Sequence, residues 1–153
     1  VDLPFELDDN ELLVEVHAAS VNASDCRIRR GEMQKDVPLV LPAVLGQDVS
    51  GVVRKVGVKV RGFQAGQCVF GRQTLERLSS GRSGSYAEWC VVDASDVALK
   101  PEALSHEQAA ACPSAAMTAF AALSAGGLVR TATSNSSDKK VVIIGASGGV
   151  GSF

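Results

Sequence analysis

The sequence has little that would attach the protein to a membrane or to nucleic acid. No apolar run approaches the roughly 20 residues that a membrane-spanning helix needs. The 15 Lys and Arg residues are outnumbered by 17 Asp and Glu residues, and no basic stripe stands out, which argues against a nucleic-acid partner. The first residues show no signal-peptide pattern and do not resemble a native beginning. We therefore expect a globular protein with no membrane span, and with a leader or an early strand missing from its start.

Cysteine is present, but in no pattern that binds a metal. No two cysteines form a CxxC pair, and each has apolar or helical neighbours: Cys26, Cys68, Cys90 and Cys112. The sequence therefore gives little support for zinc or disulfide bonds. We interpret these residues as reduced, mostly buried thiols that act as small hydrophobic side chains. Reduced thiols suit an intracellular compartment.

What is present indicates short β-strands around one core. The chain has 153 residues, 46% of them hydrophobic, which is enough for a domain with a core. Segment 11–17 alternates, with Leu12, Val14 and Val16 on one face, and segment 85–92 alternates in the same way. Glycines among these segments predict bends of a strongly curved sheet. We predict a mainly β fold with some α (α+β), built around a barrel-like β-domain.

Outside the strands, the sequence predicts two helices and one loop. Ser105 and Gln108 have the spacing of a capping box at a helix start. Pro113 ends that helix, and an alanine-rich helix follows over 114–125. Segment 71–84 is rich in glycine, serine and arginine, and we predict a mobile loop. Its arginines are interpreted as solvated in preference to binding an anion.

Polar residues gather where the first predicted strand ends. Asn22 follows that strand and precedes a short helical turn that Ser24 or Asp25 caps and Gly31 ends. Side chains at strand ends are often presented to a binding site. Asn22 is therefore either a site residue or a local turn former, and the pattern alone does not choose between them. His17, on the polar face of the strand, is interpreted as a solvated histidine.

The last residues have the pattern of a strand that leads into a phosphate-binding turn. Val141–Ile144 predict the strand, and a glycine-rich turn follows at once. Such a turn exposes backbone N–H groups, and the helix after it points its positive end at a diphosphate. The usual G-x-G-x-x-G pattern is met here by Ala146, Gly148 and Gly151, with alanine first. The pattern alone is weak, but its place directly after a strand strengthens it.

Several runs together resemble the medium-chain dehydrogenase/reductase family. They are VHAASVNASDCRIRRG, LGQDVSGVVRKVG, GSYAEWCVV, KPEALSHEQAA, MTAFAAL and VVIIGASGGVG, and they extend over nearly the whole chain. The alanine-first motif resembles the quinone oxidoreductase branch and, within it, the mitochondrial reticulon-interacting oxidoreductases. The resemblance implies a GroES-like β-barrel, the catalytic domain, over residues 1–104. It implies the truncated start of an NAD(P)-binding Rossmann domain over residues 105–153.

The resemblance also implies chemistry without zinc. Zinc-binding members of the family hold the metal through a cysteine, a histidine and a further cysteine. The matching positions here are Asn22, Gln47 and Ser114, and none of them is a thiolate or imidazole ligand. Without a Lewis acid, the expected reaction is hydride transfer to a substrate that is already electrophilic, a quinone or another activated carbonyl or enone. The expected cofactor is NADPH, preferred over NADH by resemblance alone.

The resemblance assigns roles to named residues. Asn22 and Arg27 are expected at the catalytic centre, with Asn22 beside the nicotinamide or the substrate carbonyl. Arg27 stands where relatives often have tyrosine, and it either stabilises an oxyanion or is a surface arginine. The residues expected to bind the cofactor are Asn22, Thr118, Ala146, Ser147, Gly148, Gly149, Val150 and Gly151.

For the whole protein, the resemblance implies a homo-oligomer in mitochondria or the cytoplasm. The chain alone is expected to bind no dinucleotide tightly and to be inactive, because it holds about 13 residues of a βαβ unit that needs about 30. The strand Val141–Ile144 is expected to pair with a strand from elsewhere, such as a second copy. The alternative function is a GroES-like interaction module without redox activity.

Overall fold

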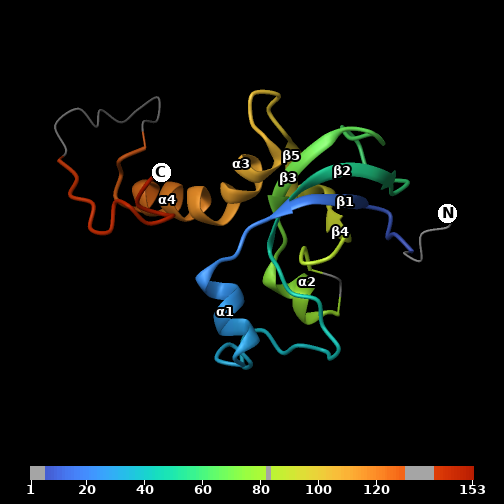
Figure 1. The fold of residues 1–153 in the computed structure, drawn as a ribbon, viewed down its shortest axis with the longest axis horizontal. Helices are drawn as coiled ribbons and strands as arrows, with labels where there is room; N and C mark the ends of the chain where they lie inside the picture. The colour runs from blue at the N-terminus through green and yellow to red at the C-terminus, as the bar shows by residue number, and fades with distance from the viewer. Residues whose placement is uncertain (1–5, 82–83, 130–139) are drawn as a thin grey trace. The chain divides into compact units, whose positions relative to one another are not determined.

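The computed structural model describes residues 6–81, 84–129 and 140–153 (Figure 1). Packing divides the chain into two compact units, Val1–Ala111 and Cys112–Phe153. This division falls later than the predicted domain boundary at 104/105, because the helix that follows residue 105 packs on the sheet of the first unit. The predicted boundary concerns where a cofactor domain begins, and it stays a prediction.

The first unit is built on a five-stranded sheet in the order β4-β1-β2-β3-β5, with every neighbouring pair antiparallel. Valine and leucine dominate the strands because such side chains pack well on a pleated, half-buried surface. The mainly β, α+β class predicted from the sequence is confirmed. The strands are β1 (Glu11–Ala19), β2 (Asp48–Val56), β3 (Cys68–Arg72), β4 (Trp89–Asp93) and β5 (Val97–Leu99).

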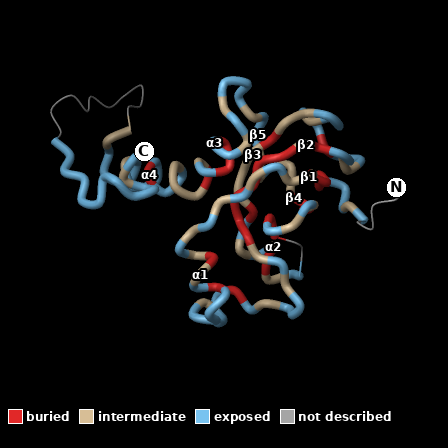
Figure 2. Tube along the Cα trace, viewed as in Figure 1, coloured by how far each residue is buried: buried red, intermediate tan, exposed pale blue. Residues whose placement is uncertain are grey.

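The strand β1 is buried on both faces where it begins. Leu12 and Val14 belong to the main hydrophobic core, as predicted for the apolar face. Glu11 and Leu13, on the opposite face, are also buried, so the prediction of a half-buried strand was wrong here. Figure 2 shows that many of the buried residues of the first unit lie along the sheet and that others lie in its helices and loops. The remaining buried members of the core cluster are Val49, Val53, Val60, Val69, Cys90 and Val92.

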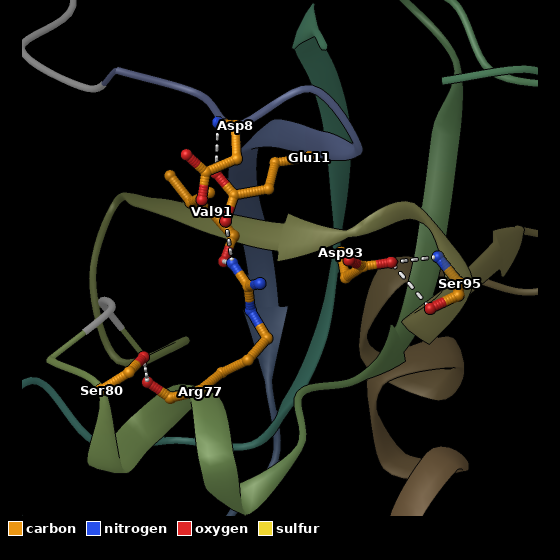
Figure 3. A network of polar contacts seen from close by, with 7 residues as sticks. All are labelled: Asp8, Glu11, Arg77, Ser80, Val91, Asp93 and Ser95. Carbon is orange, nitrogen blue, oxygen red and sulfur yellow. Dashed lines mark hydrogen bonds and ion pairs between the residues drawn. The ribbon is translucent and has the colours of Figure 1, made fainter. Parts of the chain in front are cut away.

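A side chain from a short helix reaches this second face. Segment 71–84, predicted as a solvated loop, contains the end of β3 and α2 (Leu75–Ser79). Arg77 Nη2 lies 2.6 Å from Glu11 Oε1, and the two side chains are only 16% and 3% exposed. Figure 3 shows the Arg77 side chain reaching from α2 toward Glu11 and the carbonyl of Val91. The prediction of solvated arginines was therefore wrong for Arg77, whose partner lies far away in the sequence.

Three shorter elements complete the first unit. The helix α1 (Ala23–Arg29) follows β1, and a 3-10 turn (Ala94–Asp96) joins β4 to β5. The helix α3 (His106–Ala111) packs on β1, β2 and β3. Its capping box is confirmed, because Ser105 N donates to Gln108 Oε1 at 3.0 Å and Gln108 N donates to Ser105 Oγ at 3.2 Å.

The second unit contains α4 (Pro113–Ala125) and the glycine-rich turn. Proline stands at the start of α4, where a missing N–H leaves no helical hydrogen bond unmade. Val141–Ile144 do not form the predicted strand, and these four residues are between 49% and 96% exposed. A strand needs a neighbour for its backbone groups, and no described residue pairs with these four. Within the described ranges, no helix has the length and hydrophobicity to cross a membrane.

Candidate functional site

The candidate site lies where β1 ends and α1 begins. Asn22 is the N-cap of α1 with an extended backbone, φ −113° and ψ 160°. Its backbone N–H donates to Asp25 Oδ2 at 2.8 Å, and Asp25 is only 3% exposed. The sequence had predicted Ser24 or Asp25 as the cap, whereas the cap is Asn22 and Asp25 is the third helical residue. The hydrogen bond to Asp25 fixes the backbone of Asn22 at the start of α1.

Two polar side chains contact the amide of Asn22. Its Nδ2 lies 2.9 Å from Oδ2 of Asp48 and 3.3 Å from Oγ of Ser20. Ser20 Oγ donates to the same Asp48 oxygen at 2.8 Å. Asp48 is fully buried and is the first residue of β2. Since β2 runs antiparallel to β1, its first residues lie beside the end of β1, and the sheet itself brings these three residues together.

Gln47, which matches the histidine ligand of zinc-binding relatives, is buried beside this group. Ser24 Oγ donates to its Oε1 at 2.6 Å, and its Nε2 has no hydrogen-bond partner among the described residues. Gly46 makes the close packing possible, since its φ is +103° and a side chain there would collide with Ser85 and Tyr86. Across the described part of the chain, no group of three or more His, Cys, Asp and Glu residues is placed to hold a metal ion.

A cavity of about 200 Å³ lies beside the start of α1. Tyr86 closes one side of it, and its hydroxyl donates to the carbonyl of Ser20 at 3.2 Å. Burial first, and then the charge of Asp25, raise the pKa of Tyr86 well above its usual 10.0, so the hydroxyl stays a donor. The mixture of apolar and charged side chains suits a small ligand that is partly apolar. The lining residues are Val21, Asp25, Cys26, Arg29, Leu45 and Tyr86.

Arg27 lies on α1 and pairs with a surface carboxylate. Its Nε is 3.6 Å from Glu32 Oε2, and the side chains are 59% and 46% exposed. Arg30 contacts the same carboxylate at 3.5 Å. Arg27 therefore forms a surface ion pair in this structure, and a role at an oxyanion stays a prediction.

Thr118 and the glycine-rich turn belong to the second unit, as does Ser114, the third position that matches a zinc ligand. Thr118 is exposed on α4, and its Oγ1 donates to the carbonyl of Ser114 at 2.7 Å. Side chains of α4 and of segment 141–145 line a cavity of about 490 Å³ together with residues of the turn. The helix and the turn therefore face a common hollow within this unit.

The glycine-rich turn is tightly folded. The Gly148 N–H donates to Gly145 O at 2.9 Å, and the Ser152 N–H donates to Gly148 O at 3.0 Å. A side chain at Gly151 would collide with the backbone of Gly145, so the turn requires glycine there. Its predicted cofactor residues are Ala146, Ser147, Gly148, Gly149, Val150 and Gly151, of which all but Gly151 are exposed.

The sequence analysis gave no role to Ser20, Asp48 or Tyr86. For Asp48 a signal was available, because an acidic residue stands directly after Gln47, at the start of a valine-rich segment. No local pattern in the sequence predicts Ser20 or Tyr86 as a site residue, because their hydroxyls contact partners that only the folded sheet brings close.

Fold and site together define a β-domain with a buried polar group at the ends of two neighbouring strands, followed by a helix and a glycine-rich turn. Residues 8–102 match the family described as alcohol dehydrogenase GroES-like domain. The match extends over more than half of the chain. The chain belongs to this family of GroES-like domains.

Individual relatives agree with this assignment. The chain is 39% identical over 165 residues to the mitochondrial NAD(P)H oxidoreductase RTN4IP1 of Mus musculus, covering 99% of the chain and 39% of that relative. An alcohol dehydrogenase superfamily protein from Novosphingobium aromaticivorans has a TM-score of 0.82 at 33% identity, covering 98% of this chain and 42% of that one. An Escherichia coli quinone oxidoreductase complexed with NADPH has a TM-score of 0.67 at 32% identity, covering 79% and 34%.

These likenesses confirm the resemblance to the quinone oxidoreductase branch that the sequence motifs predicted. The chain spans about two fifths of the length of the relatives it matches.

Proposed function

We propose that the whole protein is a zinc-independent oxidoreductase that uses NADPH to reduce a quinone or another activated carbonyl or enone. The observation that carries this proposal is the strand-end site. Two amides, Asn22 and Gln47, stand there at positions matching metal ligands, and hydrogen bonds to Asp48 and Ser24 hold them in place. The printed names of the relatives, an NAD(P)H oxidoreductase and a quinone oxidoreductase complexed with NADPH, support the cofactor and the substrate class.

The glycine-rich turn is the proposed site of the cofactor diphosphate. Its residues fit this role, because five of the six are exposed and Gly151 leaves no side chain beside the backbone. Thr118, on α4 of the same unit, is proposed to lie along the nicotinamide. When bound, NADPH supplies the hydride, and the chain's own residues bind and orient the reactants.

Asn22 and Arg27 are the proposed residues of the catalytic centre. Asn22 lies beside the nicotinamide in this proposal, held by Asp48. Arg27 keeps its charge at any physiological pH and would act on a developing oxyanion after leaving Glu32. The proton that completes the reduction would come from water or from another donor group of the whole protein.

Further proposals concern the whole protein. Residues 1–104 would be a catalytic GroES-like domain, and residues 105–153 would begin the cofactor domain. The protein would be a homo-oligomer. It would be located in mitochondria or the cytoplasm, and the name of the Mus musculus relative, which calls that protein mitochondrial, supports the first. The chain of 153 residues would by itself bind no dinucleotide tightly and catalyse nothing, since Val141–Ile144 are exposed and form no sheet.

The test is NADPH oxidation by the whole protein with a small quinone and, separately, an enone as acceptor. We expect turnover that survives a metal chelator, and no stoichiometric zinc by metal analysis. The matched control is Lys59→Ala, which changes an exposed ion pair with Asp9 and should leave turnover unchanged. Activity that depends on stoichiometric zinc would contradict the zinc-independent mechanism. A protein that binds no NADPH at millimolar concentration would favour an interaction module.

A further inference from the structure

The hydrogen bonds around Asp48 fix which way round the amide of Asn22 lies. A carboxylate only accepts hydrogen bonds, so Asp48 Oδ2 faces the nitrogen of that amide, at 2.9 Å, and not its oxygen. The same oxygen accepts the hydroxyl hydrogen of Ser20 at 2.8 Å. Having given its hydrogen to Asp48, the Ser20 oxygen accepts from Asn22 Nδ2 at 3.3 Å. Asp48 Oδ2 and Ser20 Oγ therefore lie on the same side of the Asn22 nitrogen, and they fix which way round the amide lies.

The carbonyl oxygen of Asn22 is turned away from Asp48 and is the acceptor that the side chain offers a ligand. The Asp25 N–H donates to the backbone carbonyl of Asn22 at 3.1 Å, and the side-chain carbonyl oxygen has two lone pairs that can accept from donors. Asn22 is only half-buried, whereas Asp48 is fully buried. A ligand that reaches Asn22 therefore meets a hydrogen-bond acceptor. Asp48, which is buried out of the ligand's reach, sets the orientation of that acceptor.

We propose that Asp48 is a positioning residue that holds Asn22 as a hydrogen-bond acceptor for a donor group of the bound dinucleotide. The donor is an N–H of the nicotinamide carboxamide or a hydroxyl of the adjoining ribose. Asn22 then contributes to cofactor binding through its side-chain carbonyl oxygen. This inference rests on the proposed function, which supplies the dinucleotide.

The first test compares Asp48→Asn, Asn22→Ala and the double variant in the whole protein. Asparagine at position 48 no longer forces the Asn22 nitrogen inward, so the amide is free to turn round. We expect the Kd for NADPH to rise about tenfold in each single variant, the size of one lost hydrogen bond. The double variant should be no weaker than Asn22→Ala, because both changes remove the same contact. Additive losses would overturn the proposal, and the control Asp9→Asn, an exposed carboxylate, should bind as the wild type does.

The second test identifies the donor on the ligand. The reduced 3-acetylpyridine analogue of the cofactor replaces the carboxamide nitrogen with a methyl group, and a deoxyribose analogue lacks the hydroxyl. The wild type should bind one of these analogues about tenfold more weakly than NADPH, and Asp48→Asn should lose that preference. A wild type that binds both analogues as well as NADPH would refute an acceptor role for Asn22.

The third test needs no cofactor, so it separates this inference from the proposed function. In the whole protein, the side-chain amide proton of Asn22 that faces Asp48 should exchange slowly by NMR, and Asp48→Asn and Ser20→Ala should speed that exchange. Fast exchange in the wild type would overturn the inference, even if NADPH binds. If the protein binds no NADPH, the proposed function fails and this measurement still decides the orientation of Asn22. If Asp48→Asn does not fold, Ser20→Ala takes its place. Unchanged proton exchange at Asn22 together with unchanged NADPH affinity in Ser20→Ala would refute the proposed positioning of Asn22.

Discussion

At the scale of single residues, Arg77 joins α2 to the first residue of β1. Its guanidinium balances the carboxylate of Glu11, whose side chain is 3% exposed. Arg77→Ala removes that cation and leaves a buried charge behind. Because breaking a buried ion pair from one side is costly, we expect the free energy of unfolding to fall by about 3 kcal/mol. Denaturant titration of the chain would measure this loss.

The matched control is an exposed ion pair of the same unit. Lys59 Nζ lies 2.8 Å from Asp9 Oδ2, and the side chains are 69% and 49% exposed. Lys59→Ala should cost less than about 1 kcal/mol, since solvent screens exposed pairs and each side chain regains freedom. Equal losses in the two variants would show that burial does not set the strength of the Arg77 pair.

His106 makes the stability of the first unit depend on pH. Its Nδ1 lies 2.8 Å from Ser50 Oγ, and its ring stacks on His17 with centroids 4.5 Å apart. His17, interpreted from the sequence as solvated, is exposed and yet makes this ring contact. Burial first, then the charges of His17 and Lys100, lower the pKa of His106 below 6.5, and Glu107 opposes them.

The sign of the pH effect follows from that lowered pKa. As the pH falls below 6.5, His106 becomes protonated in the unfolded chain but stays neutral in the folded chain, where its pKa is lower. The free energy of unfolding therefore falls. The contribution of His106 is therefore fully present above pH 6.5 and is lost between pH 6.5 and the lowered pKa. We expect the free energy of unfolding of the wild type to fall over that pH window. The free energy of unfolding of His106→Gln should fall less. Parallel curves for the wild type and His106→Gln would contradict this assignment.

At the scale of elements, the capping box of α3 is a local device with a measurable contribution. Ser105→Ala removes the hydroxyl that accepts from Gln108 N, and caps of this kind contribute about 1 kcal/mol. Since α3 packs on β1 and β2, the loss should appear in global unfolding. Ser105→Asp, which can still cap, is the control and should stay within a few tenths of a kcal/mol of the wild type. If the two variants lose the same stability, the cap is not the cause.

The elements that were predicted from the sequence are those with a local cause. The spacing of Ser105 and Gln108 is enough to predict a helix start, because the two residues satisfy each other's backbone. The pair Arg77–Glu11 could not be predicted, because its members meet only after the sheet has formed. Val141–Ile144 show the opposite error, since strand propensity without a neighbouring strand gives no strand.

The candidate site also has one part that could be predicted from the sequence and one part that depends on the folded sheet. Asn22 could be proposed from its place after a strand and from the family resemblance. The orientation of its amide depends on Asp48 and Ser20, and Asp48 comes from a separate strand. Only the antiparallel pairing of β1 and β2 brings that carboxylate within 2.9 Å of Asn22 Nδ2. The residue could therefore be named from the sequence, but its hydrogen-bonding role could not.

At the scale of the whole molecule, the second unit exposes a run of apolar side chains to solvent. Val142 and Ile144 are 87% and 96% exposed, and segment 141–145 borders a cavity of about 490 Å³. An exposed run of this kind marks an interaction surface or an aggregation risk. In the relatives, the matched region is about two fifths of a longer chain. We propose that further residues of the whole protein cover this run, and that the chain alone covers it by self-association.

Self-association through Val141–Ile144 can be measured on the chain of 153 residues. The double variant Val142→Lys/Ile144→Lys places two charges on the run, and charged residues oppose both apolar contact and strand pairing between copies. Sedimentation velocity should therefore show association of the unmodified chain and a shift toward monomer in the double variant. Val58→Lys, at an apolar residue of the first unit that is 77% exposed, is the control and should associate as the unmodified chain does. An unmodified chain that stays monomeric at every concentration would mean that Val141–Ile144 need no second copy, and the proposed self-association would have to be abandoned.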